Sequence, residues 1–204
     1  MQTLATFPLF YLPPTTYFSA LKAHNFNFIM EREEHFVKQT YRNRASIASP
    51  NGILDLIVPV VKGSKIHTSI KDVKISYDSK WQRLHWLSLQ TCYRSSAYFE
   101  YYEDEFASFY HKKYDFLFDY NLELLNWIFK QLKQSPVYSF TSEYQKELPL
   151  GFDYRTELNN KKKISQHVDF KKYFQVFSDR NEFIPNLSCI DLLFNQGPQT
   201  KSHF

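Results

Sequence analysis

The sequence contains little glycine and cysteine, and it lacks long apolar runs. Only 4 of its 204 residues are glycine, and the glycine-rich patterns of phosphate-binding loops, dinucleotide-binding turns and nucleophile elbows are missing from it. Its two cysteines, Cys92 and Cys189, form no Cys-x-x-Cys pair, which excludes the usual zinc spacings and favours buried thiols in a reducing compartment. No apolar stretch approaches the roughly 20 residues that span a bilayer.

Targeting signals and basic blocks are also absent. The N-terminus has no basic region, and Pro8, Pro13 and Pro14 interrupt its apolar residues, so we expect no signal peptide. The formal net charge is +4, and the only lysine run is at residues 161–163. Because the positive charge is small and dispersed, nucleic acid is not an expected partner. We expect a cytoplasmic protein without a membrane span, and no motif identifies a cofactor or an oligomeric state.

Aromatic residues, by contrast, are abundant, with 20 phenylalanines and 15 tyrosines. Hydrophobic residues make up 43% of the chain, a composition typical of folded globular proteins. The length suits one domain, so we expect residues 1–204 to form a single unit. Within it, residues 1–78 are expected to be mainly strands with a short helix, 79–135 helical, and 136–204 mixed.

The start of the chain predicts an α/β fold. Apolar residues at 3–12 indicate a strand that runs into a loop, residues 17–23 a short helix after a threonine cap, and residues 25–30 a second strand. A strand, a helix and a strand within some 30 residues fit a βαβ unit. In such a unit, ligands tend to bind at the loop between the first strand and the helix.

A hairpin and a helical section follow. The turn pair Asn51-Gly52 separates two apolar runs, which predicts an inserted β-hairpin. The remaining expected elements are a strand at 70–76, helices at 79–95, 103–112 and 114–133, a short strand at 137–140, and a last helix at 189–194 capped by residues 186–188.

Several motifs, in order along nearly the whole chain, resemble the WbqC-like protein family. They are Lys38-Gln-Thr-Tyr-Arg-Asn-Arg44, Asn51-Gly52 before Leu-Ile-Val-Pro-Val60, Ile70-Lys-Asp-Val-Lys-Ile-Ser76, Trp81 with His85-Trp86, Phe99-Glu-Tyr-Tyr102 with Phe109-Tyr110, and Pro185-Asn-Leu-Ser-Cys-Ile-Asp-Leu-Leu-Phe-Asn195. The resemblance implies an association with bacterial surface-polysaccharide, O-antigen-type gene clusters. The βαβ opening is also similar to the start of HUP-type, Rossmann-like nucleotide-binding folds, although residues 13–16 lack their His-x-Gly-His signature.

One segment departs from the family pattern. Many members have a His-Gln-Pro-Asn-Tyr-like segment after the first strand, and the matching stretch here is Phe7-Pro-Leu-Phe-Tyr11. Phe7 and Pro8 therefore stand where relatives have histidine and glutamine, whereas Tyr11 and Pro13 are retained. If that histidine does chemistry in relatives, this chain lacks it, and Tyr11 is left as a candidate for substrate binding.

The segment from Lys38 to Arg44 is a candidate anion site. Arg42 and Arg44 are two residues apart, so in an extended chain they share a face, and guanidinium groups bind phosphate or carboxylate bidentately. Lys38 adds an ammonium, and Tyr41 adds a ring and a hydroxyl. The alternative is that the arginines form structural ion pairs with the acidic residues of segment 31–34.

Further candidates lie on the predicted helices. Trp81 and His85 are four residues apart on one helix face, which suits a stacking platform beside an acid/base group, or else a core stripe with one satisfied histidine. Asp191 either caps the last helix or reaches an arginine of the 38–44 segment. The acidic run at 103–105 is expected to complement a helix dipole, and no metal site is predicted.

Two functions are compatible with these residues. The first is a transferase-type enzyme of surface-glycan biosynthesis that binds an anionic small molecule, such as a nucleotide sugar or an activated acyl donor. In that case Lys38, Arg42 and Arg44 would hold the anion, Tyr41 and Trp81 would stack on the substrate, and His85 would act as acid/base. The second is a non-catalytic binding or assembly protein of the same pathway, which the Phe7-Pro8 departure favours.

Overall fold

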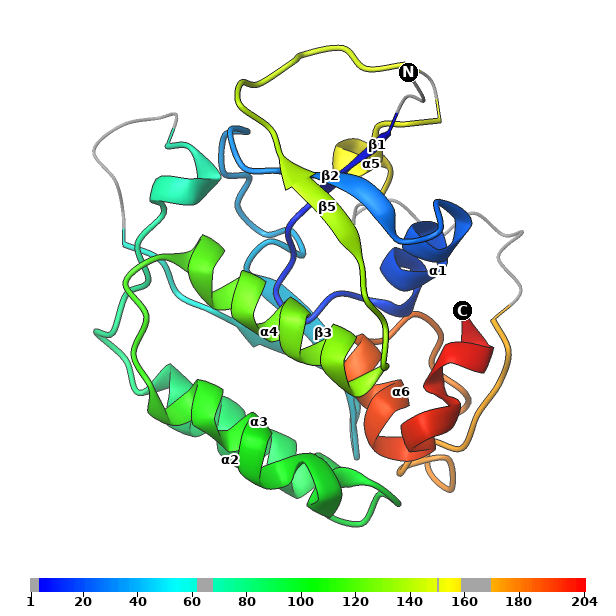
Figure 1. The fold of residues 1–204 in the computed structure, drawn as a ribbon. Helices are drawn as coiled ribbons and strands as arrows, with labels where there is room; N and C mark the ends of the chain where they lie inside the picture. Colours follow the sequence, from blue (N-terminus) through cyan, green and yellow to red (C-terminus); the bar gives the residue numbers. More distant parts are fainter. Residues whose placement is uncertain (1–3, 62–67, 150, 159–169) are drawn as a thin grey trace.

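The structure, a computed structural model, describes residues 4–61, 68–149, 151–158 and 170–204 (Figure 1). The lysine run at 161–163 lies outside this part of the chain. The elements are β1 (Ala5–Pro8), α1 (Thr15–Ala23), β2 (Asn27–Glu31), β3 (Arg44–Ser49), β4 (Gly52–Ile57), the 3₁₀ turn η1 (Ile70–Asp72), α2 (Trp81–Tyr93), α3 (Phe99–His111), α4 (Leu117–Gln131), β5 (Val137–Phe140), α5 (Tyr154–Glu157), α6 (Cys189–Gln196) and η2 (Gly197–His203). They confirm the α/β fold with a helical middle section.

The central sheet is parallel and has the strand order β1-β2-β5. The β1-α1-β2 unit is the βαβ opening expected from the sequence. The chain then passes through the β3-β4 hairpin and helices α2 to α4 before β5 joins the other edge of β2. The long crossover places the helices together, beneath the sheet in the view of Figure 1.

The two faces of this sheet differ in chemistry. Successive side chains of a strand point to opposite faces of the sheet. In the register of β1 and β2, Ala5 lies beside Phe28 and Phe7 beside Met30, and these four side chains share one face. We call this the core face, because all four side chains are completely buried. The opposite, outer face consists of these residues: Thr6 and Pro8 of β1, Asn27, Ile29 and Glu31 of β2, and Val137 and Ser139 of β5.

Aromatic packing holds the helices against the core face. The ring of Tyr17 in α1 meets Phe7 edge-on at a centroid distance of 5.6 Å. Phe118 of α4 lies 5.9 Å from Phe140 at the end of β5, and Phe129 of α4 lies 5.9 Å from Phe18 of α1. Burial of large rings is a strong stabilising term, so these contacts fix α1 and α4 to the sheet.

The cap of α6 was predicted correctly, and that of α1 was not. Ser188 accepts a hydrogen bond from the amide of Ile190, as expected for the N-cap of α6. The N-cap of α1 is Pro14, which has no side-chain cap bond. Instead, the side-chain oxygen of the distant Asn186 accepts a hydrogen bond from the amide of Thr16 at 3.0 Å. A tertiary contact thus satisfies a donor that the local sequence leaves free.

The hairpin is confirmed, whereas the strand expected at 70–76 is wrong. In the hairpin, Gly52 takes the turn with φ of +97°, a conformation that favours glycine. Residues 70–72 form a 3₁₀ turn, in which the amide of Asp72 donates to the carbonyl of Ser69 at 2.9 Å, and the amide of Ile70 donates to the carbonyl of Glu34 at 2.9 Å. The carbonyl of Val73 accepts from the amide of Leu117 at 2.8 Å. With the bonds of Lys74 and Ser76 to residues 59–61, the segment bonds to three separate parts of the chain rather than to one neighbouring strand.

Candidate functional site

A cavity of about 490 Å³ lies over the outer face of the sheet. Its floor contains Thr6, Ile29 and Ser139, and its other walls come from the segment 141–149 and from Phe152. It extends to Glu31, the last residue of β2. Ligands of open α/β sheets commonly bind outside the carboxyl ends of the strands, so the position is typical of a binding site.

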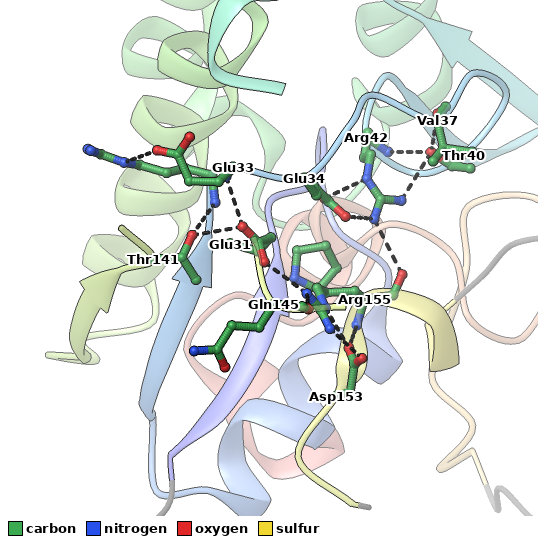
Figure 2. A network of polar contacts seen from close by, with 12 residues as sticks. Glu31, Glu33, Glu34, Val37, Thr40, Arg42, Thr141, Gln145, Asp153 and Arg155 are labelled. Atoms are coloured by element: carbon green, nitrogen blue, oxygen red, sulfur yellow. Dashed lines mark hydrogen bonds and ion pairs between the residues drawn. The ribbon is translucent and has the colours of Figure 1, made fainter. Parts of the chain in front are cut away.

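The segment 141–149 covers the cavity and is called the covering segment. Arg155 joins it to the sheet (Figure 2). Its Nη1 donates to Glu31 at 3.1 Å, and its Nε and Nη2 donate to the two oxygens of Asp153 at 2.8 and 2.7 Å. Nη1 also donates to the carbonyl of Gln145 at 2.7 Å. Hydrogen bonds from Arg155 lower the pKa of Asp153, and those to Asp153 raise the pKa of Arg155. The guanidinium is therefore already bonded on several sides.

Glu31 is completely buried, and each of its oxygens has partners. One oxygen accepts from the hydroxyl of Thr141 at 2.7 Å and from the amide of Glu33 at 2.8 Å. The other accepts from Arg155. A buried carboxylate is costly unless it is paired and hydrogen-bonded. These bonds therefore anchor Thr141, at the start of the covering segment, to the end of β2.

Arg42 forms a second buried ion pair in the same network. Its Nε and Nη2 donate to the two oxygens of Glu34 at 2.7 and 2.6 Å, and its Nη2 also donates to the carbonyl of Arg155 at 3.3 Å. Burial raises the pKa of Glu34, against the opposing effect of Arg42. Arg42 thus makes the ion pair that the sequence offered as an alternative, and Glu34 occupies the guanidinium edge that an anion would take.

Three further candidates of the 38–44 segment, Lys38, Tyr41 and Arg44, lie apart from this network. Lys38 is exposed. Arg44 forms an ion pair with Asp55 of β4, with 3.5 Å between Arg44 Nη1 and Asp55 Oδ2. Tyr41 is half-buried and packs against Phe10, with ring centroids 5.5 Å apart. Within the described parts of the chain, no hydrogen bond, ion pair or ring contact joins these three side chains to a residue lining the cavity.

The structure does bring Tyr11, His85 and Trp81 together. The hydroxyl of Tyr11 lies 3.0 Å from His85 Nδ1 and 3.0 Å from the hydroxyl of Tyr110, and the rings of Trp81 and His85 meet edge-on at 5.1 Å. All three residues are buried, and His85 is only 7% exposed. Burial lowers the pKa of His85 to about 4, so the ring is neutral near pH 7. The group is part of the core, and a substrate reaches it only if the packing opens.

Asp191 lies in a different buried cluster. Its carboxylate accepts hydrogen bonds from the hydroxyls of Tyr93 and Tyr173, both at 2.6 Å. The side-chain amide of Gln175 lies 3.5 Å from the same carboxylate. Burial raises the pKa of Asp191. Its described partners are therefore tyrosines and an amide, not an arginine of the 38–44 segment.

Arg32 is a candidate that the sequence reasoning missed. Its amide donates to Thr141 at 3.1 Å, which places it beside the cavity. Its side chain is 43% exposed, and only Nε is bonded, to Glu33 at 3.2 Å. The guanidinium carbon lies 5.6 Å from the centroid of Phe140. Neither Nη group makes a hydrogen bond to a described residue, so both can bind a ligand.

The polar floor of the cavity was also missed, although the sequence carries a signal for it. Thr6 interrupts the apolar residues of β1, and Ser139 lies between Tyr138 and Phe140 in β5. Single polar residues at alternate positions mark the non-core face of a strand. Only the fold, however, shows that the two hydroxyls share one cavity, because Thr6 and Ser139 are more than 130 residues apart in the sequence.

The described residues contain neither a group of metal-ligating side chains nor a helix that could span a membrane. Among residues 4–61, 68–149, 151–158 and 170–204, no three His, Cys, Asp or Glu side chains are grouped so that they could hold a metal ion. No helix of this same portion of the chain is both long and apolar enough to cross a bilayer.

The fold and the cavity define a mixed α/β protein with a cavity, lined by both polar and apolar residues, on the outer face of a parallel sheet. The chain belongs to the WbqC-like protein family, whose family model matches residues 10–167. It is 25% identical over 232 residues to the uncharacterized protein Rv1507c of Mycobacterium tuberculosis, an alignment that covers 100% of this chain and 97% of that protein. No solved structure matches the chain. The family resemblance seen in the motifs is thus confirmed.

Proposed function

We propose that this protein is a group-transfer enzyme of bacterial surface-glycan biosynthesis that binds an activated sugar in the cavity over the β1-β2-β5 sheet. The observation that carries the proposal is the cavity itself, about 490 Å³ in volume, at the carboxyl end of β2. Binding sites for small molecules are concave, and a few polar groups in them orient the ligand. The gene-cluster association that the family resemblance implies supports the choice of pathway, and the group-transfer reaction is proposed from that context.

The lining of the cavity suits the hydroxylated part of such a substrate. Thr6, Ser139, Thr141 and Ser142 contribute hydroxyl groups, and a hydroxyl can both donate and accept hydrogen bonds, as a sugar hydroxyl does. Phe152 contributes an aromatic ring, which can pack against the apolar face of a sugar. The sugar ring therefore occupies the cavity.

The anionic part of the substrate lies at the edge of the cavity. Inside it, Arg155 is already bonded to two carboxylates, and outside it, Arg42 is paired with Glu34. Arg32 is exposed beside Thr141 with both Nη groups available. It is therefore the cation that binds the phosphate or carboxylate, with the exposed Lys38 as a more distant contributor.

A non-catalytic binding or assembly protein is the second candidate. The observation that favours it is the environment of Phe7, which stacks on Tyr154 at 4.3 Å and is completely buried. A buried phenylalanine offers no proton donor or acceptor, and His85 is buried in the core as well. On this alternative the cavity binds its ligand and the chain performs no chemistry on it.

A filling substitution tests the cavity. Ser139→Phe places a ring in the open space over the floor, whereas Val137→Phe adds the same ring on the same face of β5 outside the cavity lining. We expect UDP-glucose to raise the melting temperature of the wild-type protein and of Val137→Phe but not of Ser139→Phe. Equal stabilisation of both variants would refute the site.

A second comparison tests the anion contact. Arg32→Gln should weaken the binding of UDP-glucose and of UDP and leave the binding of glucose unchanged. If Arg32→Gln binds all three as the wild type does, the anion lies elsewhere. Product formation from UDP-glucose and candidate acceptors, with Ser139→Phe as the inactive control, separates the enzyme from the non-catalytic protein.

A further inference from the structure

The charges around the cavity are unequal. Glu31 and Glu143 line it together with a single cation, Arg155, and Asp153 is bonded to that cation. Among the described residues, the lining and the partner of Arg155 therefore supply three carboxylates against one guanidinium, while the further cation Arg32 lies outside the lining, beside Thr141. Hydrogen bonds from Arg155 lower the pKa of Asp153, which keeps this carboxylate ionised near neutral pH. The interior of the cavity therefore favours a positively charged group, whereas the anionic part of the substrate remains at the edge with Arg32.

Glu143 is the carboxylate that can take a ligand. Both oxygens of Glu31 and both oxygens of Asp153 accept hydrogen bonds from protein groups. Glu143 is exposed in the segment that covers the cavity, and no described residue forms a hydrogen bond or an ion pair with its carboxylate. The neighbouring charges in the segment, Lys146 and Glu147, are not among the lining residues and cancel each other.

We propose that the part of the substrate in the cavity carries a protonated amino group, as an amino sugar does, and that Glu143 binds it. This inference rests on the proposed function, since it specifies the ligand of the same cavity. An ammonium donates charge-assisted hydrogen bonds to a carboxylate, while the ring hydroxyls bind the hydroxyl groups of Thr6 and Ser139. A metal ion fits less well, because no group of three ligating side chains exists among the described residues.

Three monosaccharides that differ in one group test the proposal. Glucosamine, N-acetylglucosamine and glucose are titrated into the wild-type protein in mildly acidic, low-salt buffer, and binding is followed by NMR. We expect glucosamine to bind about tenfold more tightly than the other two, the size expected for a hydrogen bond between charged groups. Glu143→Gln should abolish this preference. Glu147→Gln, a matched change at an exposed position of the same segment, should retain it.

The outcomes separate this inference from the proposed function. If all three sugars bind equally to the wild type and none binds to Ser139→Phe, the cavity is a sugar site but the amino preference is overturned. The preference is also overturned if Glu143→Gln retains it. If no sugar binds, or if Ser139→Phe binds as the wild type does, the proposed function fails and this inference fails with it.

Discussion

The two faces of the central sheet differ, although the same strands form both: one face is packed in the core and the other borders the cavity. On the core face, Phe7 and Phe28 are completely buried among aromatic rings. On the outer face, Thr6 and Ser139 form part of the floor of the cavity. Residues adjacent in sequence, such as Thr6 and Phe7, therefore lie on opposite faces, and we propose that Thr6 contributes to binding and Phe7 to stability. Phe7, which stands where the family pattern has a histidine, belongs to the core face and not to the cavity floor.

The strongest test of this division is Phe7→Ala. Phe7 stacks on Tyr154 and meets the edges of Tyr17 and Phe28. Removing such a buried ring leaves a cavity in the core, so we expect the free energy of unfolding to fall by about 3 to 5 kcal/mol. Chemical denaturation measures the change. A loss below about 1 kcal/mol would show that Phe7 is not part of a tightly packed core.

The next largest effect is expected from the ion pair that borders the outer face. Glu34→Ala leaves the guanidinium of Arg42 buried without its partner, which we expect to cost about 3 kcal/mol. The double variant Glu34→Met with Arg42→Met removes both charges, and apolar replacements of a buried pair are often close to neutral. Denaturation curves of the single and double variants give the difference.

The double variant also decides the role of Arg42. If it is stable and still binds UDP-glucose, Arg42 acts through the ion pair alone. If it is stable but has lost the binding of UDP as well as of UDP-glucose, Arg42 contacts the anion directly, as the 38–44 segment suggested from the sequence.

The sequence predicted the local features of the fold better than the site. The alternating and helical spacing of hydrophobic residues was sufficient to predict the βαβ opening, the hairpin and α4, since each of these depends on residues that are neighbours in the sequence. The cavity could not be found this way, because β1, β2 and the segment around Arg155 are far apart in the sequence and meet through tertiary contacts, such as the Glu31–Arg155 ion pair and the hydrogen bond from the amide of Thr6 to the carbonyl of Phe152. Residues 141–149 and 151–158 gave no periodic signal, yet they supply much of the cavity lining.

His85 provides a test on the buried aromatic side of the molecule. Its pKa is lowered to about 4 by burial, below the ordinary 6.5. Between these values the unfolded chain binds a proton that the folded protein excludes, so stability falls as the pH is lowered. From this group we expect a loss of about 2 kcal/mol between pH 7 and pH 5. His85→Gln should lose that much less stability over the same interval, as measured by denaturation at both pH values.

The smallest effect on stability, and the sharpest contrast with Phe7, is expected for Thr6→Val. The substitution keeps the shape and the strand preference of the side chain and removes only the hydroxyl that faces the cavity. Stability should therefore change by no more than about 0.5 kcal/mol. The affinity for the sugar should fall about fivefold, because one neutral hydrogen bond is lost. Isothermal titration beside denaturation measures both. If Thr6→Val loses stability as Phe7→Ala does, or binds the sugar unchanged, the two faces do not divide packing from binding.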